Sequence, residues 1–179
     1  MPIAALGLAV TVLGGCNPGP DRSVDSEVSQ RVAIAQLSPT EGNKVSGTVT
    51  FIEDRDGVRV VADLIGLPSG MHGFHIHENG DCSAPDASSA GGHFNPTNAK
   101  HAGPDSRVRH VGDLGNIEAT SAGQAQRDTV DSVLTFEGPN SIIGKGVIVH
   151  AGKDDLTSQP SGAAGARLAC GVIEWSDKG

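Results

Sequence analysis

Six histidines and one aspartate form an ordered set that could bind metal ions. They are His75, His77, His93, His101, His110, Asp113 and His150, and of the seven histidines in the chain only His72 lies outside the set. Imidazole nitrogens bind copper and zinc, and a carboxylate can complete a tetrahedral zinc site. Seven ligands are too many for one ion and suit two ions. The alternative, ordinary surface histidines, does not account for the order of the set.

The first two ligands are expected on one face of a strand. His75 and His77 alternate with Phe74 and Ile76. Successive side chains of a strand point to opposite faces, so the two imidazoles would share one face and the two apolar side chains the other. The segment therefore predicts half of a metal site built on a rigid strand.

Short alternating runs separated by Gly, Pro, Asn and Asp recur along the chain and predict eight strands. We expect these strands over residues 32–37, 45–53, 57–65, 73–77, 112–119, 132–136, 146–150 and 166–174. Residues 54–57, Asp-Arg-Asp-Gly, predict a hairpin turn. No helical periodicity competes with this pattern, so the sequence predicts an all-β sandwich or barrel.

Two long connections interrupt these strands, at residues 78–109 and 151–165. Loops of this length in a compact domain are often functional, and the first one contains His93 and His101. The net charge of −8 argues against a nucleic-acid partner. It would also repel an anionic substrate unless the site itself is locally positive.

The complete set of motifs resembles copper/zinc superoxide dismutase from about residue 31 to residue 175. The resemblance rests on the seven ligands together with Gly-Gly-His-Phe-Asn-Pro at 91–96 and Gly-Ala-Arg-Leu-Ala-Cys-Gly at 165–171. It implies an eight-stranded Greek-key β-sandwich or barrel of the immunoglobulin-like kind. It also implies the copper ligands His75, His77, His93 and His150, and the zinc ligands His93, His101, His110 and Asp113. His93 would bridge the two ions.

The same resemblance implies roles for four further residues. Arg167 matches the arginine that meets the anionic substrate beside the copper, and Asp154 matches a carboxylate that links a copper ligand to a zinc ligand. Cys82 and Cys170 match an intrasubunit disulfide. The implied activity is conversion of superoxide to oxygen and hydrogen peroxide by copper cycling between Cu(II) and Cu(I), with His93 releasing copper on reduction and taking up a proton.

Two other functions fit the sequence pattern less well. A copper-delivery or metal-buffering protein on the same fold would typically lack a copper ligand or the arginine, and an adhesion domain would have no redox chemistry. The pattern does not distinguish a monomer from a homodimer. We interpret His72, just before the ligand strand, as a hydrogen-bonded core histidine and not as a ligand.

The third cysteine, Cys16, follows an apolar run at residues 3–13 and the sequence Leu-Gly-Gly. This pattern resembles a bacterial lipobox, in which the cysteine is lipidated, although no Lys or Arg precedes the run. We therefore expect a signal peptide with a lipobox at 1–16, a flexible linker at 17–30 and the folded domain at 31–175. The alternative is an apolar leader with a chance cysteine. The expected protein is of the bacterial exported type, periplasmic or otherwise extracytoplasmic, where disulfides persist, and lipid-anchored to the membrane.

Overall fold

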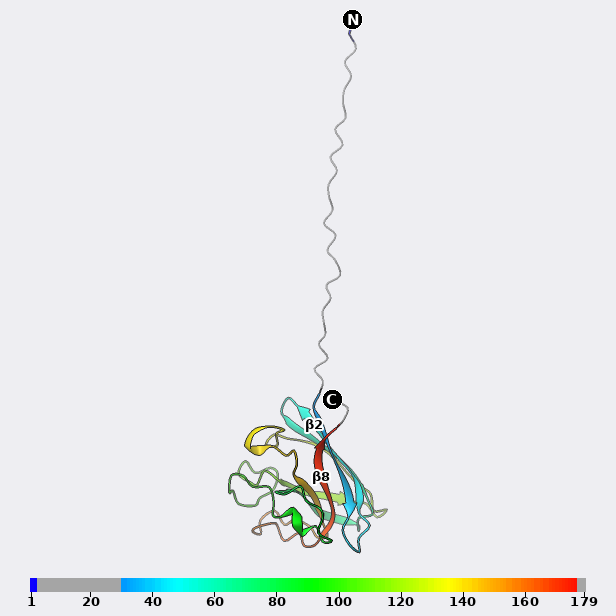
Figure 1. Cartoon of the computed structure of the whole chain (residues 1–179), viewed down its shortest axis with the longest axis vertical. Helices are drawn as coiled ribbons and strands as arrows, with labels where there is room; N and C mark the ends of the chain where they lie inside the picture. The colour runs from blue at the N-terminus through cyan, green and yellow to red at the C-terminus, as the bar shows by residue number, and fades with distance from the viewer. Residues whose placement is uncertain (3–29, 177–179) are drawn as a thin grey trace.

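The computed structural model describes residues 1–2 and 30–176, and the expected signal peptide, lipobox cysteine and most of the linker lie outside these residues. Eight antiparallel strands form a closed barrel in the order β1-β2-β3-β6-β5-β4-β7-β8 (Figure 1). The chain crosses between non-adjacent strands after β3 and after β6, which is the Greek-key connection. The predicted all-β fold is confirmed.

The strands are short and lie close to seven of the eight predicted positions. Their bounds are β1 Val32–Pro39, β2 Ser46–Asp54, β3 Gly57–Ile65, β4 Gly70–His77, β5 Asp113–Ala119, β6 Ala125–Asp131, β7 Gly146–His150 and β8 Arg167–Trp175. Asp54 pairs with Gly57, which confirms the predicted hairpin turn. In β3, buried Val58, Val60, Ala62 and Leu64 alternate with more exposed residues. The barrel therefore fills its interior with one face of each strand.

The predicted strand at 132–136 is wrong. The strand in this region is β6, and residues 132–136 instead belong to the connection between β6 and β7. Strand β6 reads Ala-Gln-Arg-Asp-Thr-Val-Asp and has buried residues only at its two ends, so it lacks the apolar alternation that marks a strand. Leu134 and Phe136 are apolar because they pack into the core from a loop.

Strands β4 and β7 are buried on both faces, which the barrel alone does not explain. Phe74 and Ile76 of β4 belong to the apolar core, whereas His75 and His77 face away from it and are also buried. The two long connections cover that outer face. They run from residue 78 to 112 and from 151 to 166, close to the predicted bounds. No helix among the described residues is long and apolar enough to cross a membrane.

Candidate metal centre

The zinc-type ligands converge on one oxygen of Asp113. The Nδ1 atoms of His93, His101 and His110 lie 2.8, 2.9 and 3.2 Å from Asp113 Oδ1, and His110 Nδ1 lies 3.4 Å from His93 Nδ1. Ligands held about 2.0–2.1 Å from a tetrahedral zinc ion lie roughly 3.3 Å from one another. The four atoms therefore have approximately the spacing of the corners of a zinc tetrahedron.

The other carboxylate oxygen of Asp113 is occupied by the backbone. Oδ2 accepts hydrogen bonds from the N–H groups of Ala102 and His110 at 3.1 and 3.0 Å. Burial by itself would raise the pKa of Asp113, but the hydrogen bonds from His93, Ala102 and His101 lower it to about 2. Asp113 is thus an ionised carboxylate whose Oδ1 faces the three imidazole nitrogens with which it could share a metal ion.

The copper-type ligands form a second group beside the first. One nitrogen from each of His75, His77, His93 and His150 lies within 4.8 Å of the others, and all four side chains are buried. The Nε2 atoms of His77 and His150 are 3.3 Å apart. Within the described residues His75 Nδ1 and His93 Nε2 are buried without a hydrogen-bond partner. Buried polar atoms normally have partners, so these two nitrogens fit a copper ion that the protein itself does not supply.

His93 belongs to both groups through opposite sides of its ring. Its Nδ1 atom is one corner of the zinc set, and its Nε2 atom is the unpartnered nitrogen of the copper set. A single imidazole can coordinate two metal ions in this way only when both of its nitrogens are deprotonated. The structure thus places His93 as the bridging residue that the resemblance implied.

The remaining ring nitrogens of the copper ligands are held by the protein. His77 Nδ1 lies 2.9 Å from the Gly91 carbonyl oxygen, His150 Nδ1 lies 3.1 Å from that of Gly165, and His75 Nε2 lies 2.7 Å from Asp154 Oδ2. Such outer partners fix the tautomer and orientation of metal-binding imidazoles. Desolvation by burial lowers the pKa of His75 to about 4 and that of His150 to about 3. Both rings are therefore neutral and able to bind metal near neutral pH.

Asp154 lies between the two metal groups and is completely buried. Its Oδ2 atom meets His75 of the copper set, and its Oδ1 atom lies 2.9 Å from Nε2 of His101 of the zinc set. For His101, burial lowers the pKa, but the hydrogen bonds to Asp154 and Asp113 outweigh burial and raise it. Asp154 therefore contacts one ligand of each set, as the resemblance implied.

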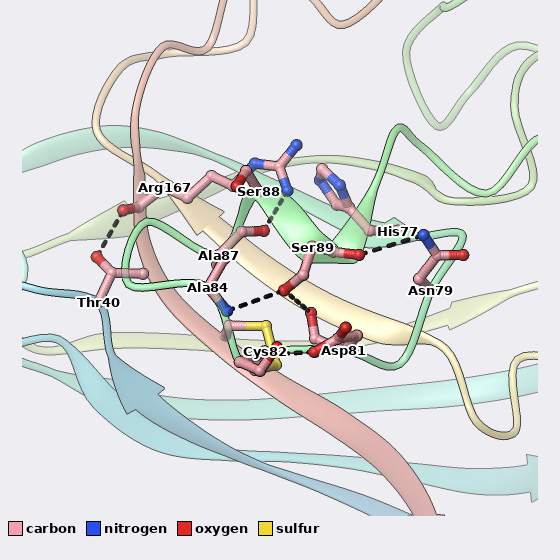
Figure 2. The surroundings of a disulfide bond; sticks show 12 residues. Thr40, His77, Asn79, Asp81, Cys82, Ala84, Ala87, Ser88, Ser89 and Arg167 are labelled. Atoms are coloured by element: carbon pink, nitrogen blue, oxygen red, sulfur yellow. Dashed lines mark hydrogen bonds between the residues drawn. A yellow bond between two sulfur atoms is a disulfide. The ribbon is translucent and has the colours of Figure 1, made fainter.

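The disulfide joins Cys82 of the first long connection to Cys170 of β8, with the two Cα atoms 5.8 Å apart, so the predicted pairing is confirmed. Figure 2 shows the side chain of Arg167 next to Ala87 and Ser88, which belong to the same long connection as Cys82. Its guanidinium group donates to the carbonyl oxygens of Ala87 and Gly91. Because Gly91 also bonds to His77, one carbonyl group connects Arg167 to a copper ligand.

A cavity of about 750 Å³ opens above the copper set. Its walls include His77, His93 and His150 as well as Arg167 and Gln159. Among the residues that line it, Arg167 is the only Arg or Lys and Glu78 is the only acid. Burial lowers the pKa of Arg167, but a guanidinium remains charged at neutral pH. A small anion that enters the cavity therefore meets a positive group next to the copper ligands.

The comparison with known proteins agrees with this geometry. The family described as "Copper/zinc superoxide dismutase (SODC)" matches residues 45–173. The chain belongs to the copper/zinc superoxide dismutase family.

Individual relatives support this membership over most of the chain. An extracellular superoxide dismutase [Cu-Zn] of Drosophila melanogaster is 42% identical over 182 residues, covering 96% of each chain. The corresponding extracellular enzyme of Brugia pahangi is 43% identical over 153 residues, covering 80% of this chain and 76% of its own. The crystal structure of the clock protein EA4 superposes with a TM-score of 0.73 at 43% identity, covering 80% of this chain and 93% of that one.

This superoxide dismutase has complete copper and zinc ligand sets, which confirms the predicted enzyme and both predicted cofactors. A copper-delivery protein that lacks a ligand is a poorer match for a site with none missing. These two named dismutases are animal extracellular enzymes, so the comparisons do not bear out the bacterial lipoprotein type that the cysteine motif indicated.

The sequence pattern did not reveal that Asn116 and Gln159 support the superoxide dismutase site. Asn116 of β5 donates to the carbonyl oxygen of Asp154 and accepts from its N–H, at 2.9 and 2.8 Å. Gln159 binds the backbone of His101 in the same two-way manner. His72, by contrast, is buried with its ring nitrogens 2.8 Å from the carbonyl oxygens of His150 and Pro68, which confirms its prediction as a hydrogen-bonded core histidine. An isolated Asn or Gln has no sequence signal for such a contact.

Proposed function

We propose that Arg167 guides superoxide to the copper ligands and that His93 carries a proton during turnover. Overall, two superoxide ions and two protons give one oxygen and one hydrogen peroxide. When bound, copper supplies the one-electron exchange, and zinc, which has no redox chemistry, holds one side of His93. His93 Nε2 is suited to the proton because it faces the copper set, while Nδ1 is held in the zinc set.

The observation that carries this proposal is the shared imidazole between two complete ligand sets. Arg167 supports the proposal because two backbone carbonyl groups hold its guanidinium group in place, so that its positive charge lies at the wall of the cavity. We further propose that Asp154 fixes the orientation of the His75 and His101 rings relative to each other, because it is fully buried and its carboxylate hydrogen-bonds to both rings.

We also propose that the enzyme works outside the cytoplasm. The Cys82–Cys170 disulfide supports this location, because such bonds persist in oxidising compartments. A signal peptide at 1–16, a linker at 17–30, a domain at 31–175 and a lipid on Cys16 remain proposals that rest on the sequence pattern. Expressed behind a functional export signal, the natural chain should partition with membranes and Cys16→Ala should not; equal partitioning would exclude the lipid.

The catalytic proposal is tested by metal content together with activity. The purified protein should hold about one copper and one zinc per chain and should consume superoxide catalytically. Copper removal should abolish the activity, and copper addition should restore it. A protein that binds both metals in these amounts but does not consume superoxide would contradict the proposal and favour a metal-buffering role.

A further inference from the structure

The loop from residue 151 to 166 holds the zinc ligand His101 by a contact that needs no metal. Gln159 Oε1 accepts a hydrogen bond from the backbone N–H of His101, and Gln159 Nε2 donates to the backbone oxygen of the same residue, both at 2.9 Å. Nε2 also donates to the Thr157 oxygen at 2.9 Å. One side chain therefore satisfies both backbone groups of a zinc ligand and braces its own loop.

The same loop closes over the side chain of His101. Asp154 Oδ1 lies 2.9 Å from His101 Nε2, and Gly162 passes directly above that contact. A Cβ atom at Gly162 would lie 1.8 Å from Asp154 Oδ1 and 2.7 Å from His101 Nε2. The Gly162 N–H donates to the Ser158 oxygen at 2.7 Å, and the Asp155 N–H donates to the Gly162 oxygen at 2.9 Å. The turn from 154 to 162 is therefore a cap on the ring of His101, and Gln159 is its attachment to the backbone.

We propose that Gln159 is a positioning residue for zinc: it docks the cap formed by residues 154–162 onto His101 and thereby slows zinc release. Zinc cannot leave without movement of its ligands, and His101 cannot move away while both of its backbone groups and its ring are held. Gln159 also lines the cavity above the copper set. Release of this contact should therefore loosen the wall of the substrate cavity together with the zinc site.

This role of Gln159 does not depend on the catalytic roles of Arg167 and His93. Gln159 is not a metal ligand, so its removal leaves all seven ligands in place. Outer partners of metal ligands typically contribute tenfold to a hundredfold to metal affinity. Gln36 provides a matched control, because on β1 it also donates to a backbone oxygen, that of Gly47, and accepts from a neighbour, Thr48.

The experiment compares Gln159→Ala, Gln159→Glu and Gln36→Ala. Fully metallated protein is mixed with a chromophoric zinc chelator, and the rate of zinc transfer is recorded. Hydrogen exchange of the His101 amide is measured separately in metal-free protein, with the amides of β1, β2 and β3 as an internal measure of folding. We expect Gln159→Ala to release zinc about tenfold faster and to lose protection at the His101 amide. The Gln36 variant should match the natural protein in both measurements.

Gln159→Glu separates the effect of the hydrogen bonds that Gln159 donates from the effect of the one that it accepts. It keeps an acceptor for the His101 N–H, but sets a carboxylate oxygen against the carbonyl oxygens of His101 and Thr157, so it should release zinc at least as fast as Gln159→Ala. The proposal is overturned if Gln159→Ala releases zinc at the natural rate. It is also overturned if the His101 amide stays protected in that variant, or if Gln36→Ala accelerates release equally.

Discussion

At the scale of single residues, Arg167 brings a positive charge to the cavity that the copper ligands line. Arg167 is held by the carbonyl oxygens of Ala87 and Gly91, and the second of these also holds His77. The charge is therefore placed by backbone atoms close to the ligands and does not depend on a flexible ion pair. In a chain of net charge −8, this position is well suited to attract a small anion locally.

Neutralising Arg167 should slow the reaction. A unit charge about 5 Å from the substrate at an effective dielectric constant near 20 contributes roughly 3 kcal/mol, and less after screening. We expect Arg167→Ile to lower the rate of superoxide loss about tenfold or more at equal copper content, and Arg167→Lys to lower it least. Arg55→Ile, in the exposed turn between β2 and β3, changes the net charge equally and is the control. An unchanged rate and salt dependence for Arg167→Ile would place substrate guidance elsewhere.

His93 should be the residue whose loss separates binding from catalysis. In His93→Ala three ligands remain on each side, so both metals are expected to bind, more weakly. Activity should fall by at least about a hundredfold, the scale that a positioned proton donor contributes. The measurements are copper and zinc content, followed by the superoxide assay at equal metal loading. Full activity with both metals bound would show that the bridge is not needed.

At the scale of elements, the site depends on strands that contribute one face to the barrel core and the other face to the metal sites. Strand β4 places Phe74 and Ile76 in the barrel and His75 and His77 outside it. The loop at 78–112 folds back over that outer face, where Ala87 and Ala90 pack on Ile148 and Cys170 in a small second cluster. This second cluster is small, and Phe94 and Val111 of the same loop reach the main core; the rest of the loop depends on its ligands and its disulfide for order.

Removing zinc should therefore loosen the loop at 78–112. Zinc binds only the folded arrangement of His93, His101, His110 and Asp113, so its binding energy adds to stability, by about 4 kcal/mol when free zinc exceeds the dissociation constant a thousandfold. Hydrogen exchange should rise in this loop and stay slow in β1, β2 and β3. Thermal unfolding measured with and without a chelator gives the change in stability. A melting temperature that is the same with and without the chelator would contradict this prediction.

For the whole molecule, the disulfide connects parts of the chain that are far apart in sequence. Cys82 and Cys170 are separated by 88 residues, and a closed loop of that size restricts the unfolded chain by about 4–5 kcal/mol in the entropy model. The bond also ties the metal-binding loop to β8, which pairs with β1 and completes the barrel.

Reduction of this bond should lower the stability of the metal-free protein. We expect a loss of about 3 kcal/mol, because measured effects are usually below the entropy estimate, and a melting temperature lower by roughly 10 °C. Cys82→Ser with Cys170→Ser should behave like the reduced protein. Equal melting temperatures in the oxidised and reduced forms would show that the barrel and the loop contacts are sufficient alone.

The sequence by itself determined the fold class and the set of seven metal ligands, and its resemblance to a known family implied the division into two sites and the disulfide partners. These rest on residue types with few alternative uses, such as His75 and His77 two apart on an alternating strand. The pattern failed at β6, because a strand that points Arg127 toward the carbonyl oxygens of Leu114 and Asn116 carries no apolar alternation. It also mistook Leu134 and Phe136 for strand residues, because a loop that packs into the core is as apolar as a strand.

Only the tertiary structure showed that two carboxamide side chains, Asn116 and Gln159, support Asp154 and the zinc ligand His101. Asn116 lies 38 residues from Asp154, and Gln159 lies 58 residues from His101. Each acts through backbone atoms of its partner, and a backbone group looks the same at every position of a sequence. The folded barrel brings the loop at 151–166 against β5 and against the loop at 78–112, and that proximity alone turns two ordinary carboxamides into supports of the metal site.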